Sequence, residues 1–167
     1  SIYDTGLQDP VYTQNFAGLL ALDMKYCGDG GLVIIFDRTA VRLNAKHEIV
    51  WQIDFGGLAA YATSPDGTVG LLLDGTEGIG STLKVCGAEG ELWSAQIPGQ
   101  AKGLSVREGG AAYLAGGQVK LLDKTGRTAG AADCSLDTAY TVLGSKFVVL
   151  AGKGKLTRIF LSDMDNA

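Results

Sequence analysis

The apolar and polar positions of this chain alternate in short blocks that recur at a nearly constant interval. Tight-turn sequences separate pairs of apolar runs at Asp29-Gly30, Asp66-Gly67, Gly109-Gly110 and Gly144-Ser145. Asp-Gly and Gly-Gly readily supply the positive φ that a tight hairpin turn needs. The run after each turn is strongly apolar, and short apolar runs bounded by turns are typical of buried strands. The pattern therefore predicts four hairpins.

A second block follows each hairpin and also repeats. It consists of a strand, a polar turn and another strand, and its copies begin at Val41, Leu83, Val119 and Thr157. These starting points are 42, 36 and 38 residues apart. The first three copies keep a basic second residue, which is Arg42, Lys84 or Lys120. A repeat at this interval indicates stacked supersecondary units that share one core.

Each unit would hold four short strands in about 38 residues. This length leaves no room for a crossover helix, so the strands must pair antiparallel. We therefore predict an all-β fold, a β-propeller of about four four-stranded antiparallel blades in one domain over residues 1–167. The predicted blades are approximately 17–55, 56–98, 101–135 and 136–161.

Small residues are frequent in the first strand of each unit, with Gly18, Gly57 and Gly103 near its start. Such residues suit the innermost strand of a blade, where the sheets converge on an axis. The fourth unit ends before its last strand, while the segment Val11–Phe16 precedes the first unit. We expect residues 11–16 to complete the last blade, because closing the ring removes unpaired strand edges.

Composition and charge narrow the possible functions. The chain has 25 Gly and only three Pro in 167 residues, which agrees with many tight turns. Its net charge is −4 and its Lys and Arg residues are scattered, so nucleic acid is not an expected partner. No run of 18 apolar residues is present, so we predict no membrane insertion by this segment. Because the sequence starts at Ser1 rather than Met, we expect that an upstream segment has been removed.

A turn glycine followed by Trp resembles the repeat of PQQ-like (WD40/quinoprotein-type) β-propellers. Gly90 and Trp93 carry this pattern. Other units keep one half of it, since Trp51 lacks the glycine and Gly126 lacks the tryptophan. In that family the tryptophans pack between neighbouring blades. The resemblance implies the same structural role for Trp51 and Trp93.

The chain also resembles uncharacterised membrane-anchored propeller proteins of Gram-positive bacteria. This resemblance implies an extracytoplasmic location, with anchoring at the cell surface by an upstream segment. Propellers of that kind usually have more than four blades, which implies that the chain is part of a larger ring. A homodimer of two half-rings is the other arrangement that we consider.

Little in the sequence indicates catalytic, metal or cofactor chemistry. Cys27, Cys86 and Cys134 are far apart and form no CxxC or Cys/His cluster, so we expect free thiols acting as small hydrophobic residues. Neither an acidic calcium cluster nor an adjacent cysteine pair is present, so we expect no bound quinone. The single histidine, His47, lies between charged neighbours in a predicted turn and should be exposed. We assign no catalytic residue, no metal ligand and no cofactor.

Two irregular stretches carry further acidic residues. The segment Asp74–Thr82 lacks the Lys-Ser/Thr ending of a phosphate loop, and its Asp74 and Glu77 lack the spacing of a calcium loop. As the insertion that breaks the repeat, it is the first expected contact surface. Asp163 and Asp165 lie near the C-terminus, where we expect a solvated tail.

These observations predict a non-catalytic binding or scaffold module for protein–protein or cell-surface interaction. The expected partner is a protein or a glycan, and the ligand-binding residues stay unassigned. The alternative is an enzyme, a lyase or a hydrolase, that uses carboxylates near the central channel. Asp23, Asp54 and Asp137 flank the first strands and are the candidates, although turn capping accounts for each of them separately.

Overall fold

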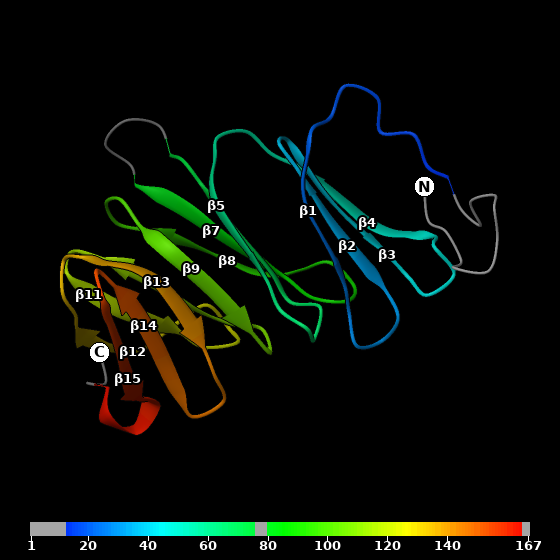
Figure 1. Ribbon diagram of the computed structural model, residues 1–167. Helices are drawn as coiled ribbons and strands as arrows, with labels where there is room; N and C mark the ends of the chain where they lie inside the picture. Colours follow the sequence, from blue (N-terminus) through cyan, green and yellow to red (C-terminus); the bar gives the residue numbers. More distant parts are fainter. Residues whose placement is uncertain (1–12, 76–79, 165–167) are drawn as a thin grey trace.

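The structure, a computed structural model, describes residues 13–75 and 80–164, which form four antiparallel β-sheets (Figure 1). Sheet 1 contains β1 (Ala21–Tyr26), β2 (Leu32–Phe36), β3 (Thr39–Leu43) and β4 (Ile49–Asp54). Sheet 2 contains β5 (Leu58–Thr63), β6 (Val69–Leu73), β7 (Ser81–Cys86) and β8 (Glu91–Ile97). Sheet 3 contains β9 (Lys102–Arg107), β10 (Gly110–Ala115), β11 (Gln118–Leu122) and β12 (Thr128–Asp133). Sheet 4 contains β13 (Thr138–Leu143), β14 (Phe147–Gly152) and β15 (Lys155–Phe160).

Strands within each sheet pair in chain order, as the repeat predicts. The helical structure in the described ranges is one turn of 3-10 helix, η1 (Leu161–Asp163). No helix within those ranges is long and apolar enough to cross a membrane. The sequence-based prediction of an all-β fold made of antiparallel sheets is therefore confirmed.

The repeat extends to the strand register. In all four sheets a β-bulge interrupts the pairing between the first and second strands, close to the start of the first strand. A bulge bends its strand and increases the local twist. The four sheets consequently stand side by side in one arc, with β1, β5, β9 and β13 on the same side (Figure 1).

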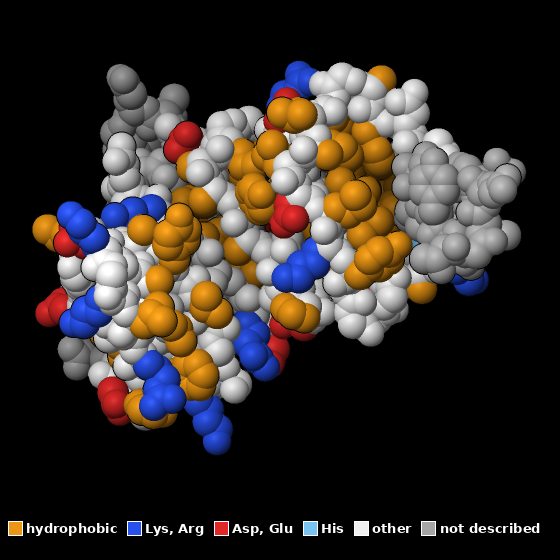
Figure 2. Space-filling view, viewed as in Figure 1, with side chains coloured by type: hydrophobic (Ala, Val, Ile, Leu, Met, Phe, Trp, Pro, Cys, Tyr) orange, Lys and Arg blue, Asp and Glu red, His pale blue; other side chains and the backbone are white. Residues whose placement is uncertain are grey.

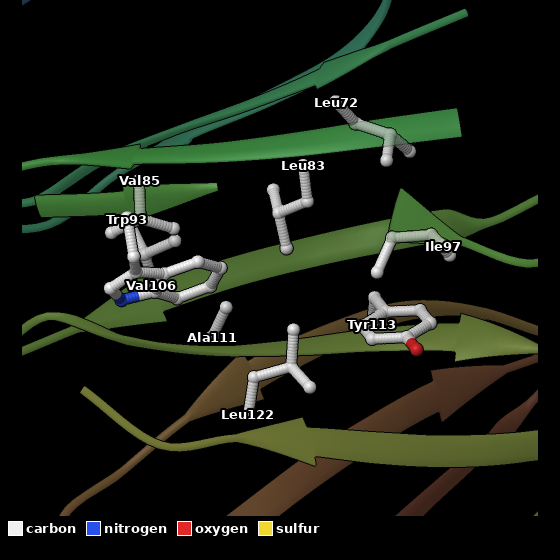
Figure 3. Close-up of a cluster of buried hydrophobic side chains, with 9 residues drawn as sticks. All are labelled: Leu72, Leu83, Val85, Trp93, Ile97, Val106, Ala111, Tyr113 and Leu122. Carbon is white, nitrogen blue, oxygen red and sulfur yellow. The ribbon is translucent and has the colours of Figure 1, made fainter. Parts of the chain in front are cut away.

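Neighbouring sheets bury their hydrophobic faces against each other. Between sheets 2 and 3, for example, Leu83, Val85 and Trp93 meet Ala111 and Tyr113 (Figure 3). Similar clusters join sheets 1 and 2 and sheets 3 and 4. Burial of apolar surface between sheets is thus the main favourable free energy of the fold.

Each tryptophan docks its sheet on the next one. The indole Nε1 of Trp51 donates to the carbonyl of Gly87 at 3.0 Å, and that of Trp93 donates to the carbonyl of Gly109 at 2.7 Å. Both rings are 8% exposed. A Cβ at Gly126 would lie 2.7 Å from the Trp93 ring, so the turn glycine of sheet 3 is needed for this contact. The structural role predicted for the two tryptophans agrees with these contacts.

A buried arginine connects the first two sheets. Arg42 on β3 is 1% exposed, and its guanidinium donates to Asp29 Oδ2 at 2.7 Å and to the carbonyl of Gly67 at 3.0 Å. The hydrogen bond from the Gly31 N–H, together with Arg42, lowers the pKa of Asp29. Arg42 therefore ties the β1–β2 turn of its own sheet to the β5–β6 turn of sheet 2.

Asp66 continues this connection to sheet 3. Its Oδ2 accepts the backbone N–H of Glu108 at 2.7 Å, while its Oδ1 accepts the N–H of Thr68 at 2.7 Å and the hydroxyl of Ser64. Partial burial works to raise the pKa of Asp66, but these hydrogen bonds outweigh it and lower the pKa. The Thr68 hydroxyl in turn accepts the N–H of Gly109. Polar contacts thus link the first turns of three successive sheets.

Residues 13–16 of the N-terminal segment do not complete sheet 4 within this chain. Residues 13–16 form no strand, and Phe16 packs on Phe36 of sheet 1 with ring centroids 4.8 Å apart. Residues 11–12 of the expected closing strand lie outside the described residues. Among the described strands sheet 4 has three, at the opposite end of the arc from sheet 1 (Figure 1). The expected closure therefore fails for residues 13–16, whose one apolar side chain, Phe16, is partly buried against sheet 1 at the other end of the arc.

Replacing Trp93 should reveal the strength of the docking between sheets 2 and 3. We expect Trp93→Ala to lower the free energy of unfolding by about 3–5 kcal/mol, because it removes a buried aromatic ring. Trp93→Phe keeps most of the packing and should cost less, with about 1 kcal/mol assigned to the lost hydrogen bond. Urea unfolding monitored by circular dichroism measures both, and equal losses for the two variants would contradict this role.

The free energy of unfolding should depend on pH through the ionisation of Asp66. Because its folded-state pKa is lowered, the Asp66 contribution is present above the unfolded value of about 3.9 and is lost as pH falls through the folded-state pKa. Asp66→Asn removes the titrating group, so its free energy of unfolding should fall less than that of the wild type between about pH 6 and about pH 3. Glu89→Gln, which removes an exposed carboxylate from the β7–β8 turn, is the charge-matched control and should retain the wild-type slope.

Candidate binding groove

The loop 134–137 connects β12 to β13 and crosses the junction between sheets 3 and 4. Two clefts, of about 430 Å³ and about 300 Å³, adjoin this loop. Cys134, Ser135 and Thr138 line both clefts. We call the two clefts and this loop the loop groove. Clefts of this size are typical of sites that hold a small ligand or a few side chains of a peptide.

Short hydrogen bonds hold the loop in place. The N–H of Cys134 donates to the carbonyl of Gly117 at 2.8 Å, which fastens the loop to the β10–β11 turn. The N–H of Thr138 donates to the carbonyl of Ser135 at 2.9 Å and closes the turn before β13. Lys102 on β9 donates through Nζ to the carbonyl of Leu136 at 3.4 Å. The loop is therefore a fixed wall shared by the clefts.

The loop groove combines apolar surface with charged side chains. Leu114 and Leu150 are buried in its floor, whereas Leu136 at its crest is 78% exposed. Leu136 is the most exposed of the large hydrophobic residues in the described part of the chain, and its place at the smaller cleft makes it a candidate contact residue. Lysines border the clefts at positions 102, 153 and 155, and the carboxylates there belong to residues 133 and 137.

The three candidate carboxylates do not come together. Asp137 lines the larger cleft, whereas Asp23 and Asp54 belong to sheet 1. Asp23 accepts the N–H of its neighbour Met24 at 2.8 Å. Asp54 accepts the hydroxyl of Thr39 at 2.7 Å, and this bond, with one from Gln52, lowers the pKa of Asp54. Local hydrogen bonding therefore accounts for both residues of sheet 1.

The other predicted residues also lie apart. His47 occupies the predicted turn, between β3 and β4 at φ +64, but it is half-buried rather than exposed as expected. Asp74 and Asp163 are exposed, while Glu77 and Asp165 lie outside the described residues. Over residues 13–75 and 80–164, no group of three or more His, Cys, Asp or Glu side chains could hold a metal ion.

Similarity to known proteins is found by comparing structures and not by comparing sequences. No family model matches the sequence, and no curated protein matches it. The solved structure of BamB from Moraxella catarrhalis matches with a TM-score of 0.59 and 12% identity, over 86% of this chain and 49% of BamB. Saccharomyces cerevisiae Sqt1 matches with a TM-score of 0.58 and 13% identity, over 82% of this chain and 43% of Sqt1.

The WD40 domain of Neurospora crassa Pan2 matches with a TM-score of 0.53 and 13% identity, over 87% of this chain and 50% of that domain. WD40 repeats form the blades of β-propellers. The fold is a β-propeller. The four sheets are its blades. At these identities the likeness establishes the fold alone, and the chain spans about half the length of the solved propellers it matches.

Sequence analysis missed the loop groove of this propeller and favoured the segment Asp74–Thr82 instead. The available signal was Leu136, a large apolar residue between the polar residues Ser135 and Asp137 in a connecting loop. The two clefts themselves depend on how the two sheets are spaced, which a sequence pattern does not specify.

Thiol reactivity should identify Cys134 as the accessible cysteine. All three cysteines are free; Cys27 and Cys86 are buried, and Cys134 is half-buried in the groove. Burial raises the pKa of Cys86 to about 12 and also raises that of Cys27, so neither forms much thiolate at neutral pH. We expect one thiol per folded chain to react with Ellman's reagent, and none in Cys134→Ala. Rapid reaction of the other two in the folded protein would contradict the burial described above.

Proposed function

We propose that this propeller is a non-catalytic binding module that holds a peptide segment of a partner protein in the loop groove. The observation that carries the proposal is Leu136, 78% exposed on a fixed loop that lines two clefts. An exposed apolar side chain supported by a rigid loop can bury itself in a complex at little conformational cost.

The charges around the groove indicate the chemistry of the peptide. Lys102, Lys153 and Lys155 favour carboxylates, although the chain as a whole carries a net charge of −4. Asp133 is engaged by the amide of Gln118 at 3.0 Å and Lys102 by the carbonyl of Leu136 at 3.4 Å, so Lys153, Lys155 and Asp137 are the remaining charged groups of the larger cleft. A segment with an apolar side chain flanked by acidic residues fits this surface best.

The dispersal of the candidate carboxylates supports a non-catalytic module over the alternative of a lyase or hydrolase. A pair acting as general acid and base must converge on one bond. Asp23 and Asp54 lie in sheet 1, away from the groove. Asp137 shares the larger cleft with Asp133, whose carboxylate accepts the amide of Gln118, and the Asp137→Asn test below decides whether this pair is catalytic. A glycan partner is less favoured, because the groove crest is an aliphatic side chain rather than an aromatic platform.

Selection from a phage-displayed peptide library tests the proposal directly. We expect enrichment of peptides that carry an apolar residue beside Asp or Glu. Their affinity, measured by fluorescence polarisation, should fall at least about tenfold for Leu136→Asp, because a hot-spot side chain contributes more than about 1.4 kcal/mol. Val50→Asp, at an exposed position on β4 of sheet 1, is the matched control and should bind as the wild type does.

Three results would contradict the proposal. The first is peptide binding that is equal in Leu136→Asp and the wild type. The second is binding confined to oligosaccharides on a glycan array. The third is turnover of ester, peptide or glycoside substrates that is lost in Asp137→Asn.

We also propose an extracytoplasmic location with anchoring by an upstream segment, which rests on the resemblance to membrane-anchored propellers. Cell fractionation with an antibody against the domain tests it, and recovery in the cytosolic fraction would refute it.

A further inference from the structure

The last sheet of the arc differs from the rest of the chain in charge. Residues 138–160 contain no Asp or Glu, and their basic residues are Lys146, Lys153, Lys155 and Arg158, whereas the whole chain has a net charge of −4. All four basic residues are exposed, and none forms an ion pair with another described residue. Figure 2 shows Lys and Arg side chains among apolar ones over this end of the arc. Sheet 4 therefore presents positive charge that favours an acidic partner.

Sheet 4 also ends in an edge strand. Within the described residues β15 pairs with β14 alone, whereas sheets 1, 2 and 3 each have a fourth strand at the corresponding place. After β15 the chain bends into the core, since the Leu161 N–H donates to the carbonyl of Lys146 at 2.9 Å and Met164 packs between sheets 3 and 4. An edge strand offers unpaired backbone N–H and C=O groups, so β15 can accept a further strand.

The two faces of β15 have different surroundings. Successive side chains of a strand point to opposite faces. The face toward sheet 3 holds Ile159, which packs into the core, and Lys155 and Thr157, which line the larger cleft. The other face is exposed and holds every second residue, namely Leu156, Arg158 and Phe160. Strand β15 thus forms a wall of the loop groove on one face and an open surface on the other.

Arg158 is the charged group of this open surface. Its guanidinium lies over the rings of Phe147 and Phe160, with 5.7 and 4.9 Å between the guanidinium carbon and the ring centroids. Cation–π contacts position a guanidinium without neutralising its charge. Leu156 and Val142 lie on the same face and are 75% and 62% exposed. A strand added beside β15 would therefore meet one positive charge between apolar side chains.

We propose that the acidic peptide binds to β15 as the fourth strand of sheet 4, an inference that rests on the proposed function. The fourth strands of sheets 1, 2 and 3 have six or seven residues and run antiparallel to their neighbours, so the peptide matches β15 over six residues. Residues directly opposite each other in antiparallel strands interact most strongly. The expected sequence, from the residue opposite Phe160 to the residue opposite Lys155, is apolar, apolar, acidic, polar, apolar, acidic. Its two acidic residues lie opposite Arg158 and Lys155.

The same orientation brings the peptide to the loop groove. The residue opposite Lys155 lies at the larger cleft, because Lys155 lines that cleft together with Ser135 and Asp137 of the loop. Residues that follow it in the peptide reach the loop and its exposed Leu136. The edge of β15 thus supplies backbone hydrogen bonds, and the groove supplies the side-chain contacts that select the sequence.

Amide hydrogen exchange on the 167-residue chain tests the added strand. The probe is the synthetic peptide Val-Val-Glu-Thr-Val-Glu-Gly-Leu-Glu, whose first six residues match β15 and whose last three place an apolar residue beside an acidic one. We expect it to protect alternate backbone amides of Lys155–Phe160, those whose N–H groups point away from β14. No added protection there, while Leu136→Asp still weakens binding, would overturn the added strand and leave the proposed function intact. Affinity that is equal in Leu136→Asp and the wild type would instead contradict the proposed function.

A charge exchange gives a readout that loss of folding could not produce. Arg158 lines neither cleft, so binding in the groove alone should not depend on it. Arg158→Glu should lower the affinity for the probe about fivefold in fluorescence polarisation, and a probe with Lys as its third residue should regain most of this loss. Lys46→Glu, the same charge change at an exposed position of the β3–β4 turn, is the matched control and should bind as the wild type does. Equal affinity of Arg158→Glu for the two probes would overturn the proposal.

The exchange experiment also distinguishes two other occupants of the edge. Without peptide, the outward-pointing amides of β15 should exchange rapidly at every chain concentration. Protection that increases with concentration would assign the edge to a second copy of the chain. Protection that is independent of concentration and is lost on deletion of residues 1–12 would assign it to the N-terminal residues of the same chain. Either result would overturn the proposal.

Discussion

The structure depends on one constraint, which is that no sheet of this chain can bury its hydrophobic face without the next sheet. A single four-stranded sheet exposes two faces to water, and only stacking removes them. The contacts that fix the stacking are directional as well as apolar. Trp51 and Trp93 each insert a ring and place an indole N–H on a carbonyl of the following sheet, at Gly87 and Gly109. Because a carbonyl position is set by a turn, these bonds fix the register between sheets as well as their separation.

The repeat could be predicted because its signals are local. Asp29 and Asp66 each accept a backbone N–H two residues later, so the same Asp-Gly turn chemistry recurs whatever surrounds it. The role of Arg42 could not be predicted in this way. It aligns with Lys84, which lies at the surface and pairs with Glu91 at 3.0 Å, yet Arg42 is 1% exposed. The difference comes from its spatial neighbours, since its guanidinium must span the turns of two sheets, and only a long side chain with several donors can do so.

The loop groove lies outside the repeat for a related reason. Its floor comes from Leu114 and Leu150, ordinary core residues of sheets 3 and 4, and only the crest residue Leu136 departs from expectation by being exposed. From the sequence pattern, apolar residues in strands are assigned to the core and connecting loops are assumed to be exposed to solvent. The groove is formed where core residues at a sheet edge meet a connecting loop. Neither an apolar residue in a strand nor a loop between strands indicates a binding surface when each is considered separately. The segment Asp74–Thr82 had the opposite character, an evident interruption of the repeat that leaves Asp74 simply exposed.

Stacking also explains why the ends of the arc and the groove are separate features. The groove forms between sheets 3 and 4 of one copy, where stacking is complete and the connecting loop is fixed by Gly117 and Ser135. On the outer face of sheet 4 this stacking is incomplete, because Tyr140 and Leu156 are exposed there, whereas the outer face of sheet 1 is buried at Leu32 and Val41. The groove and the exposed face of sheet 4 therefore depend on different residues, although both follow from how one sheet covers the next.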